Sequence, residues 1–435
     1  MVNRLPCGYK ISTHRMNKKK VIIAGGGFAG IQLARKLDQR LFDVLLVDKI
    51  NHHQFQPLFY QVATSQLEPS SISFPLRNIF SRKKNVQIRL AEILSIDRNE
   101  SKIITSIGEF SYDYLVLAMG CTNNFFGNEN IKKNAFTLKT TYDAITIRNH
   151  IILTFEKIVS AKEDELEALN NLAIVGAGPT GVELAGAFAE IKKNILPKDY
   201  AGVDFSKFNI ILIEGTRNTL GSMSDASKVE SRRYLQQMGV TILTETFVAD
   251  YDGYLLKLSN GETIKTKTVI WVAGVTGNNI EGLPEAARAP GNRISVDRFN
   301  RVNGCDNVFA VGDTAYMVTP KYPKGHPQVA NVAINQAKLL AKNLKSIQTG
   351  KKLKAYEYKN LGTMATIGRN KAVVDLPHIH LKGYFAWFIW MSLHLMLILS
   401  VRNKLIIFIN WAWSYLTKDT SLRLILKEDK PRTNT

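Results

Sequence analysis

The feature that most constrains the fold is a glycine-rich turn that occurs twice, each time between a short apolar run and a helix-like segment. The first copy reads GGGFAG and the second GAGPTG. In a strand–turn–helix unit such glycines let the backbone approach a pyrophosphate, and the helix N-terminus supplies N–H donors. The glycines are Gly25, Gly27 and Gly30 in the first copy, and Gly176, Gly178 and Gly181 in the second. The chain is therefore expected to be an α/β protein with two Rossmann-like dinucleotide-binding domains.

Each copy is followed by an acidic residue at the end of a second apolar run. Asp48 ends the run LLVD, 18 residues after the last glycine of its turn, and Glu214 ends the run IILIE, 33 residues after its own. A carboxylate at this place accepts a hydrogen bond from a ribose hydroxyl. The longer second interval predicts an insertion around residues 193–208. Glu214 favours NADH, because it repels the 2′-phosphate of NADPH, although the nearby Arg217 weakens this preference.

The repeat extends beyond the two turns. Residues 112–120 and 268–274 are both apolar runs that end in a small-residue turn, the second at Gly274. A further run, VFAV, leads into Gly312 and Asp313, whose carboxylate can accept from a sugar or ribitol hydroxyl of the first dinucleotide. Two Rossmann units predict two nucleotide cofactors, or one cofactor and one co-substrate.

The net charge of +20 belongs to the two ends of this 435-residue chain. Residues 1–20 carry six Lys/Arg and no acid, residues 321–435 carry 19 Lys/Arg against five acids, and the residues between carry 32 of each sign. A nucleic-acid enzyme more often has its basic footprint on the catalytic body, so no nucleic-acid partner is expected. Three cysteines without a paired spacing argue against a disulfide scaffold and a Cys-rich metal site, and no metal is expected.

The C-terminal end is apolar and rich in tryptophan. Residues 384–401 contain no charge, and after Arg402 and Lys404 the apolar sequence continues to residue 416, so that four of the five tryptophans fall in this region. Tryptophan beside Lys/Arg is typical of a membrane interface, which favours helices that lie on an anionic lipid surface. A spanning helix, for which the run is borderline in length, a pair of buried helices and a dimer interface are the alternatives.

Several strings resemble the type II NADH dehydrogenases, the single-subunit NADH:quinone oxidoreductases among the two-dinucleotide-fold flavoproteins. The resemblance extends from about Lys18 to Thr417 and implies one non-covalently bound FAD, NADH as co-substrate, a membrane quinone as acceptor, and neither Fe–S clusters nor proton pumping. We expect the enzyme at the cytoplasmic face of a bacterial inner membrane, with the mitochondrial inner membrane as the weaker alternative. The strings are NHHQFQPLFYQVAT at 51–64, GAGPTGVELAG at 176–186, AVGDTA at 310–315 and NWAWSY at 410–415.

The resemblance also implies a domain organisation. An NADH-binding domain is inserted into a discontinuous FAD-binding domain, and C-terminal amphipathic helices dock on the membrane. The expected segments are a basic disordered arm at 1–20, the FAD domain at 21–135 and 295–350, the NADH domain at 136–294, and the docking region at 351–435.

Glu183 falls where the family places a glutamate at the meeting of nicotinamide, flavin and quinone. Its position two residues after Gly181 suggests the first turn of a helix, where the dipole stabilises a carboxylate and where simple capping is the alternative. The family's A-Q-x-x-x-Q pattern is altered here, because Ala330 is kept but Asn331 and Asn335 replace the glutamines. Their i, i+4 spacing puts both amides on one helix face. The quinone species stays open.

The expected site residues follow from these motifs and from the resemblance. The candidate FAD ligands are Gly25, Gly27, Gly30, Asp48, Gly312, Asp313, Ala330 and Asn331. The candidate NADH ligands are Gly176, Gly178, Gly181, Glu214 and Gly274. The candidate quinone contacts are Glu183, which is also the candidate catalytic residue, Gln328, Asn331 and Asn335.

The expected reaction passes hydride from NADH to the flavin and two electrons on to the quinone. Sulfide:quinone oxidoreduction is the main alternative, since Cys121 and Cys305 flank two of the motifs, but it has no use for a second nucleotide site. Other pyridine-nucleotide reductases of the same fold and a basic, non-enzymatic binding protein are weaker alternatives. A homodimer is left open.

Overall fold

The computed structural model describes residues 18–419 and 422–425, and most of the expected N-terminal arm lies outside these residues. The chain forms two compact units. The first unit comprises the residues up to Asn51, Leu76–Gly120 and Asn278–Glu357, and the second comprises His52–Pro75, Cys121–Gly277 and the chain from Tyr358 onward. This division is made by contacts within the chain and does not show which nucleotide each segment binds. The expected boundaries of the FAD and NADH domains therefore remain a prediction.

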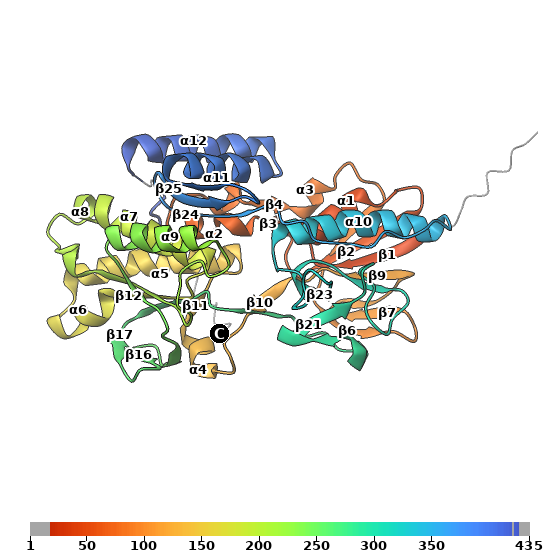
Figure 1. Ribbon diagram of the computed structural model, residues 1–435, viewed down its shortest axis with the longest axis horizontal. Coiled ribbons are helices and arrows are strands. Elements are labelled where there is room, and N and C mark those ends of the chain that lie inside the picture. The colour runs from red at the N-terminus through yellow and green to blue at the C-terminus, as the bar shows by residue number, and fades with distance from the viewer. Residues whose placement is uncertain (1–17, 420–421, 426–435) are drawn as a thin grey trace, which may run out of the picture. The chain divides into compact units, whose positions relative to one another are not determined.

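Each unit contains a five-stranded parallel sheet of the same design (Figure 1). The strand order is β22-β9-β1-β2-β5 in the first unit and β11-β18-β12-β13-β14 in the second. The first sheet comprises β1 (Lys19–Ala24), β2 (Phe42–Asp48), β5 (Val86–Leu90), β9 (Tyr114–Leu117) and β22 (Val308–Ala310). The second comprises β11 (Phe136–Thr137), β12 (Asn171–Val175), β13 (Asn209–Ile213), β14 (Val240–Leu243) and β18 (Thr268–Trp271). The prediction of two Rossmann-like domains is confirmed.

The two units also resemble each other in a smaller antiparallel sheet that each of them contains. The first unit has β6 (Ile93–Asp97), β7 (Lys102–Thr105) and β8 (Gly108–Ser111), and the second has β15 (Val248–Tyr251), β16 (Leu255–Leu258) and β17 (Thr263–Lys265). The glycine turns lead into α1 (Phe28–Lys36) and α7 (Pro179–Asn194). The sequence repeat is therefore a repeat of whole supersecondary units.

Burial explains why the central strands read as continuous apolar runs. β12 is buried at every position, as are the last four residues of β1, because helices cover both faces of a parallel sheet. In the first unit, α1 and α10 (Ala330–Gln348) pack together against the sheet. The alternation of buried and exposed positions along α10 fixes which of its side chains face the nucleotide turns.

The expected insertion before Glu214 consists largely of helix. α7 continues to Asn194 and is followed by α8 (Leu196–Asp199) and a short 3-10 turn, Phe205–Lys207. β13 begins directly afterwards, at Asn209. The long interval between glycine turn and acid therefore leaves the strand–turn–helix–strand order intact.

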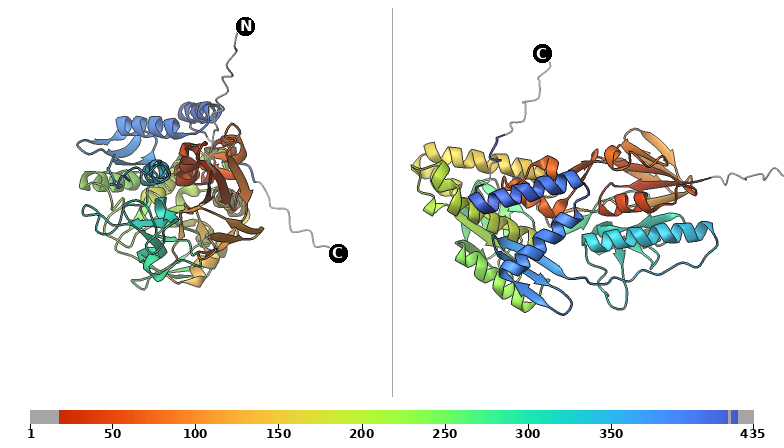
Figure 2. Two further views of the ribbon diagram at one scale, coloured as in Figure 1. Left: turned by 90° about the vertical axis from the view of Figure 1, so that its right-hand side faces the viewer. Right: turned by 90° about the horizontal axis from the view of Figure 1, so that it is seen from above.

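The C-terminal part of the second unit is a small sheet covered by two helices. β24 (Thr363–Gly368), β25 (Lys371–Asp375) and β26 (His380–Lys382) form the sheet, which lies between helices α7 and α9 (Asp225–Gln237) on one face and α11 (Gly383–Leu397) on the other (Figures 1 and 2). Gly186 of α7 permits the close approach of β24, because a Cβ there would stand 1.7 Å from the carbonyl oxygen of Ile367. This contact brings the middle of α7 against the C-terminal sheet.

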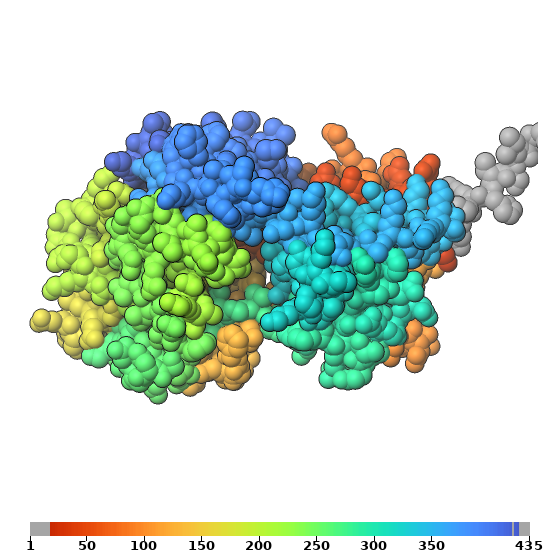
Figure 3. Space-filling model, viewed as in Figure 1, coloured from red at the N-terminus to blue at the C-terminus, as the bar shows by residue number. Residues whose placement is uncertain are grey.

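The apolar tail forms two separate helices. α11 ends at Leu397 and α12 (Val401–Thr417) begins four residues later, so the break falls before Arg402 and Lys404, which lie inside α12. Within the described ranges, no helix combines the length and apolarity needed to cross a bilayer. The two helices form part of the surface of the second unit and are coloured blue in Figure 3.

Candidate functional site

The first glycine turn is held by the carboxylate that follows it. Asp48, at the end of β2, accepts hydrogen bonds from the backbone N–H groups of Gly26, at 2.5 Å, and Ile50, at 2.9 Å. Gly25 has φ +106°, and a Cβ there would stand 2.5 Å from the carbonyl oxygen of Ala118. At Gly27, by contrast, the space around a built Cβ is empty to 4 Å. The turn is tightly closed toward the sheet and open where a pyrophosphate would approach.

The second glycine turn repeats this arrangement. Glu214, directly after β13, accepts from the backbone N–H of Ala177 at 2.7 Å and from both the N–H and the hydroxyl of Thr216 at 2.9 Å. The space around a built Cβ at Gly178 is again empty to 4 Å. Gly274, just after β18, has φ +72°. The predicted positions of both acids, at the tips of the second strands, are confirmed by the geometry.

The Gly312 turn brings in a residue that the sequence motifs did not indicate. The backbone N–H of Gly312, with φ +76°, donates to Oε1 of Gln336 at 2.8 Å. Gln336 is fully buried, and its Nε2 has no hydrogen-bond partner in the part of the chain that the structure describes. A buried amide N–H without a partner costs free energy, so it fits a site whose ligand supplies an acceptor. Gln336 and the open cradle at Gly27, both in the first unit, fit a bound FAD.

The two asparagines that replace glutamines lie on one face of α10, as the i, i+4 spacing predicts. Nδ2 of Asn335 donates to Oδ1 of Asn331 at 2.6 Å. Gln328, just before the helix, donates to the backbone carbonyl of Asp313 at 3.2 Å. These residues belong to the first unit and Glu183 belongs to the second, so a shared contact with one quinone stays a prediction.

Glu183 lies in a buried and mostly uncharged place. The helix begins at Pro179, which makes Glu183 its fifth residue, and the side chain is 8% exposed. Its Oε1 receives only a long hydrogen bond, 3.4 Å, from the backbone N–H of Thr366. Burial raises the pKa of Glu183 from 4.5 to about 8, while the Thr366 N–H and the Trp390 indole lower it less. The expected first-turn carboxylate stabilised by the helix dipole is therefore wrong, because Glu183 lies beyond the first turn and is desolvated.

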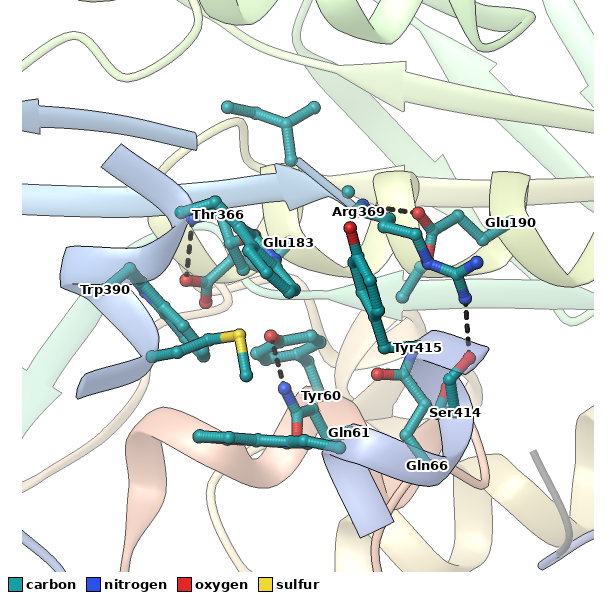
Figure 4. A pocket seen from close by; sticks show the side chains of 16 residues that line it. Tyr60, Gln61, Gln66, Glu183, Glu190, Thr366, Arg369, Trp390, Ser414 and Tyr415 are labelled. Carbon is teal, nitrogen blue, oxygen red and sulfur yellow. Dashed lines mark hydrogen bonds between the residues drawn. The ribbon is translucent and has the colours of Figure 1, made fainter. Parts of the chain in front are cut away.

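Aromatic and amide side chains complete the cavity that contains Glu183 (Figure 4). Gln61 accepts a hydrogen bond from the indole Nε1 of Trp411 at 2.7 Å and donates from Nε2 to the Tyr60 hydroxyl at 2.7 Å. Burial, and then the Glu183 charge, raise the pKa of Tyr60 well above its ordinary value, so the phenol keeps its proton. The indole N–H of Trp390 is buried on the same side without a hydrogen-bond partner of normal geometry among the described residues. This side of the cavity thus offers several protons around Glu183.

Comparison with known proteins decides the family. Residues 19–337 match the pyridine nucleotide-disulphide oxidoreductase family, and residues 360–418 match the NDH2 C-terminal domain. The type II NADH:quinone oxidoreductase Ndh of Mycobacterium tuberculosis is 31% identical, with 92% of this chain and 89% of the relative covered. The chain belongs to the type II NADH:quinone oxidoreductases.

Further members and folds agree with this assignment. The type II NADH:quinone oxidoreductase of Staphylococcus aureus is 28% identical over 82% of this chain and 89% of its own length. The structure of NDH2 from Plasmodium falciparum in complex with NADH matches with a TM-score of 0.86 at 22% identity, covering 94% of this chain and all of the other. The sulfide:quinone oxidoreductase of Aquifex aeolicus shares the fold less closely, with a TM-score of 0.70 at 20% identity over 89% of this chain and 92% of its own.

Of the two cysteines on which the sulfide alternative rests, Cys121 and Cys305, the second is not activated in this type II oxidoreductase. Cys305 is half-buried, and burial raises the pKa of its thiol. A reactive cysteine requires the opposite shift, because the thiolate is the nucleophile. The family assignment and this environment both favour NADH over sulfide as the electron donor.

The far wall of the Glu183 cavity holds a second acid and an arginine. Glu190, on the same helix, accepts from the backbone N–H of Arg369 at 2.5 Å, and burial raises its pKa. The Arg369 guanidinium donates to the carbonyl of Ser414 at 2.8 Å and lies over the Tyr415 ring. The sequence motifs did not indicate Glu190, Arg369, Tyr60 or Gln61 as site residues, and they indicated Trp390 and Trp411 only as parts of an interfacial tail. The strings 51–64 and 410–415 that carry the family resemblance contain Tyr60, Gln61, Trp411, Ser414 and Tyr415.

Proposed function

We propose that this chain catalyses NADH:quinone oxidoreduction with one FAD and without proton pumping. The observation that carries the proposal is the buried, protonatable Glu183, which lies beneath the aromatic C-terminal helices of a chain with two dinucleotide turns. Bound FAD supplies the redox chemistry, accepting hydride from NADH and passing two electrons to the quinone. The residues described below bind, orient and move protons.

The first unit would hold FAD. Gly25, Gly27 and Gly30 would let the backbone approach the pyrophosphate, Asp48 would accept from a ribose hydroxyl, and the Gly312–Asp313 turn would hold the ribitol. Ala330 and Asn331, at the start of α10, add contacts near the same turn. The unpaired Nε2 of Gln336 supports this assignment, because its side chain already holds the Gly312 N–H and a bound group would supply the acceptor that Nε2 lacks.

The second unit would hold NADH. Gly176, Gly178 and Gly181 form the pyrophosphate turn, and Gly274 closes the neighbouring strand end. Glu214 accepts from the 2′-hydroxyl of the ribose and repels a 2′-phosphate. The chain is therefore proposed to prefer NADH over NADPH.

Glu183 is proposed as the proton donor to the quinone. Hydride transfer brings two electrons and one proton from NADH, so reduction of a quinone to the quinol needs one more proton. At neutral pH the raised pKa keeps Glu183 protonated, and solvent restores its proton afterwards. Gln328, Asn331 and Asn335 are proposed to hydrogen-bond the quinone carbonyls.

The outer faces of α11 and α12 are proposed to lie on an anionic membrane surface. On α11, Ala386, Trp390 and His394 are buried at intervals of four residues, and His394 stacks on Trp390 with burial lowering its pKa to about 4. The opposite faces expose large apolar side chains beside the cations Arg402 and Lys404, as in an interfacial helix. The exposed set is Tyr384, Phe385, Phe388, Leu393, Met396, Leu397, Val401, Leu405, Phe408, Ile409, Trp413, Tyr415 and Leu416. We place this surface at the cytoplasmic face of a bacterial inner membrane.

The proposal is tested by steady-state kinetics on the purified full chain with a short-chain quinone. The protein should be yellow, should oxidise NADH in the presence of the quinone, and should lose most of this turnover in Glu183→Gln. The control acceptor is ferricyanide, which takes electrons and no proton, and its reduction should survive in the same variant. Unchanged quinone turnover in Glu183→Gln would remove the proposed role of this residue, whereas absence of NADH oxidation in the wild type would overturn the proposed reaction.

A further inference from the structure

The second unit contains a second cavity, built around a buried arginine. Arg148 is 2% exposed, and neither its Nε nor its Nη2 has a hydrogen-bond partner among residues 18–419 and 422–425. Burial lowers its pKa, and the charge of Glu68 raises it by less. Arginine nevertheless stays charged in proteins at neutral pH, and a buried, unpaired charge is among the most costly features of a fold. The site therefore favours an anion that the chain itself does not provide.

The arginine lines a cavity of about 200 Å³, and the other residues that line it divide about evenly between apolar and polar ones. This volume exceeds several times the roughly 30 Å³ that a water molecule occupies in the liquid, and it is smaller than the roughly 300–1,000 Å³ of pockets for drug-sized ligands. Arg148, Ile152 and Phe155 share one face of α5 (Thr141–Ser160) at helical spacing, and Phe188 and Leu196 lie opposite. The cavity is suited to a small molecule that has one charged end and a short apolar body.

The acids at this cavity restrict the charge of that ligand. Glu156 and Asp199 also line it, and both are exposed rather than buried. Glu156 accepts from the Tyr200 hydroxyl at 2.7 Å, and Asp199 forms an ion pair with Arg423 at 2.6 Å. Two nearby carboxylates disfavour a doubly charged phosphate more than a singly charged group. A guanidinium can bind one carboxylate through two parallel N–H donors.

We propose that this cavity is a binding site for a short-chain aliphatic monocarboxylate, with the carboxylate on Arg148 and the chain against Ile152, Phe155, Phe188 and Leu196. The site is separate from the Glu183 cavity, although two helices contribute to both. α7 directs Ala187 and Glu190 to the Glu183 cavity and Phe188 and Ile191 to this one. Neither the NADH nor the quinone assignment uses any residue of the Arg148 cavity.

Titration calorimetry on the FAD-loaded full chain tests the proposal, with hexanoate as the probe. We expect saturable binding of one hexanoate per chain, at least tenfold tighter than hexanamide, which has the same shape without the charge, and than acetate, which has the charge without the chain. Equal binding of either analogue, or no hexanoate binding up to millimolar concentration, would overturn the proposal.

Three variants locate the binding. Arg148→Met removes the charge at similar volume, and because it relieves an unpaired buried charge it should fold; hexanoate binding should fall at least tenfold. Arg35→Met, at an exposed arginine, is the matched control and should bind as the wild type does. Leu196→Phe fills the apolar end and should also weaken binding, which keeps the test decisive if the Met variant misfolds. Glu183→Gln should leave hexanoate binding unchanged, and loss in that variant would place the ligand in the quinone cavity instead.

Discussion

The indole Nε1 of Trp411, on the last helix, donates a 2.7 Å hydrogen bond to Oε1 of Gln61, which lies 350 positions earlier in the chain. Nε2 of Gln61 in turn donates a hydrogen bond to the hydroxyl of Tyr60 at 2.7 Å. Both Trp411 and Gln61 are buried. The aromatic tail is thus part of the wall of the Glu183 cavity as well as the proposed membrane surface.

Trp411→Phe should destabilise the protein and impair its use of quinone. The substitution leaves the buried Oε1 of Gln61 without a donor, which costs about 1–3 kcal/mol and releases the orientation of Tyr60. The free energy of unfolding should fall by that amount, and kcat/KM for quinone should fall more than ferricyanide reduction does. Trp413→Phe is the matched control on the same helix, because Trp413 is 58% exposed, and it should change neither quantity. Equal effects in the two variants would contradict the role given to this bond.

The pH profile of quinone reduction should report Glu183. Because its pKa is raised to about 8, the carboxyl carries its proton at neutral pH and loses it as the pH rises through that value. Quinone turnover should therefore decline above about pH 8, while NADH:ferricyanide turnover should not follow the same decline. In Glu183→Gln the residual quinone activity should lack this alkaline limb. Retention of the limb in that variant would assign it to another group.

The same group predicts how stability depends on pH. The folded state keeps a proton on Glu183 that the unfolded state loses near pH 4.5, so the free energy of unfolding falls as the pH rises from about 4.5 to about 8. At roughly 1.4 kcal/mol per pKa unit the full change amounts to a few kcal/mol. The free energy of unfolding is measured with denaturant at fixed FAD concentration for the wild type and for Glu183→Gln. The wild-type value minus the variant's value should decline with rising pH across this window and stay constant below it. A constant difference from pH 5 to 8 would contradict the raised pKa.

Glu214→Gln should weaken the discrimination between NADH and NADPH. The amide oxygen can still accept from the Ala177 N–H and from the ribose, but the charge that repels a 2′-phosphate is gone. We expect the ratio of kcat/KM for NADH to that for NADPH to fall about tenfold, equivalent to about 1.4 kcal/mol. Glu245→Gln, at an exposed acid in the loop that follows β14, controls for a general change in charge. An unchanged ratio in Glu214→Gln would mean that another residue discriminates between NADH and NADPH.

Membrane binding should depend on the exposed faces of α11 and α12. Replacing Phe385 and Phe388 together by Gln should weaken sedimentation with anionic vesicles, because their apolar surface no longer enters the interface. Phe126 and Phe247, which are equally exposed elsewhere on the second unit, provide the control pair. Point changes are preferable to deleting the tail, since Trp390 and Trp411 face inward and their loss would open the Glu183 cavity. Equal sedimentation of the two double variants with vesicles would contradict the proposal that the exposed faces of α11 and α12 bind the membrane.

The local parts of the site could be predicted from the sequence, and the long-range parts could not. A glycine turn between strand and helix, with an acid at the next strand end, is fixed by nearby residues, which is why Asp48 and Glu214 were placed correctly. Gln336 was not predicted as a site residue, because which side of α10 faces the Gly312 turn depends on how α10 packs against α1. The environment of Glu183 depends on residues from three distant segments, 60–61, 366 and 390. Their approach rests on tertiary packing, so the helix position alone led to the wrong electrostatics.

The two sheets differ at one edge, and this difference bears on how long each nucleotide stays. In the first unit the strand beside β9 is β22, which leads into the Gly312 turn and its buried Gln336. In the second unit the corresponding strand, β11, has two residues and is followed by α5 without such a turn. Both acids bind their glycine turns in the same way, so the carboxylates do not distinguish a resident cofactor from an exchanging one. We expect the extra turn to slow dissociation of the first dinucleotide, while its absence lets the second leave after every turnover.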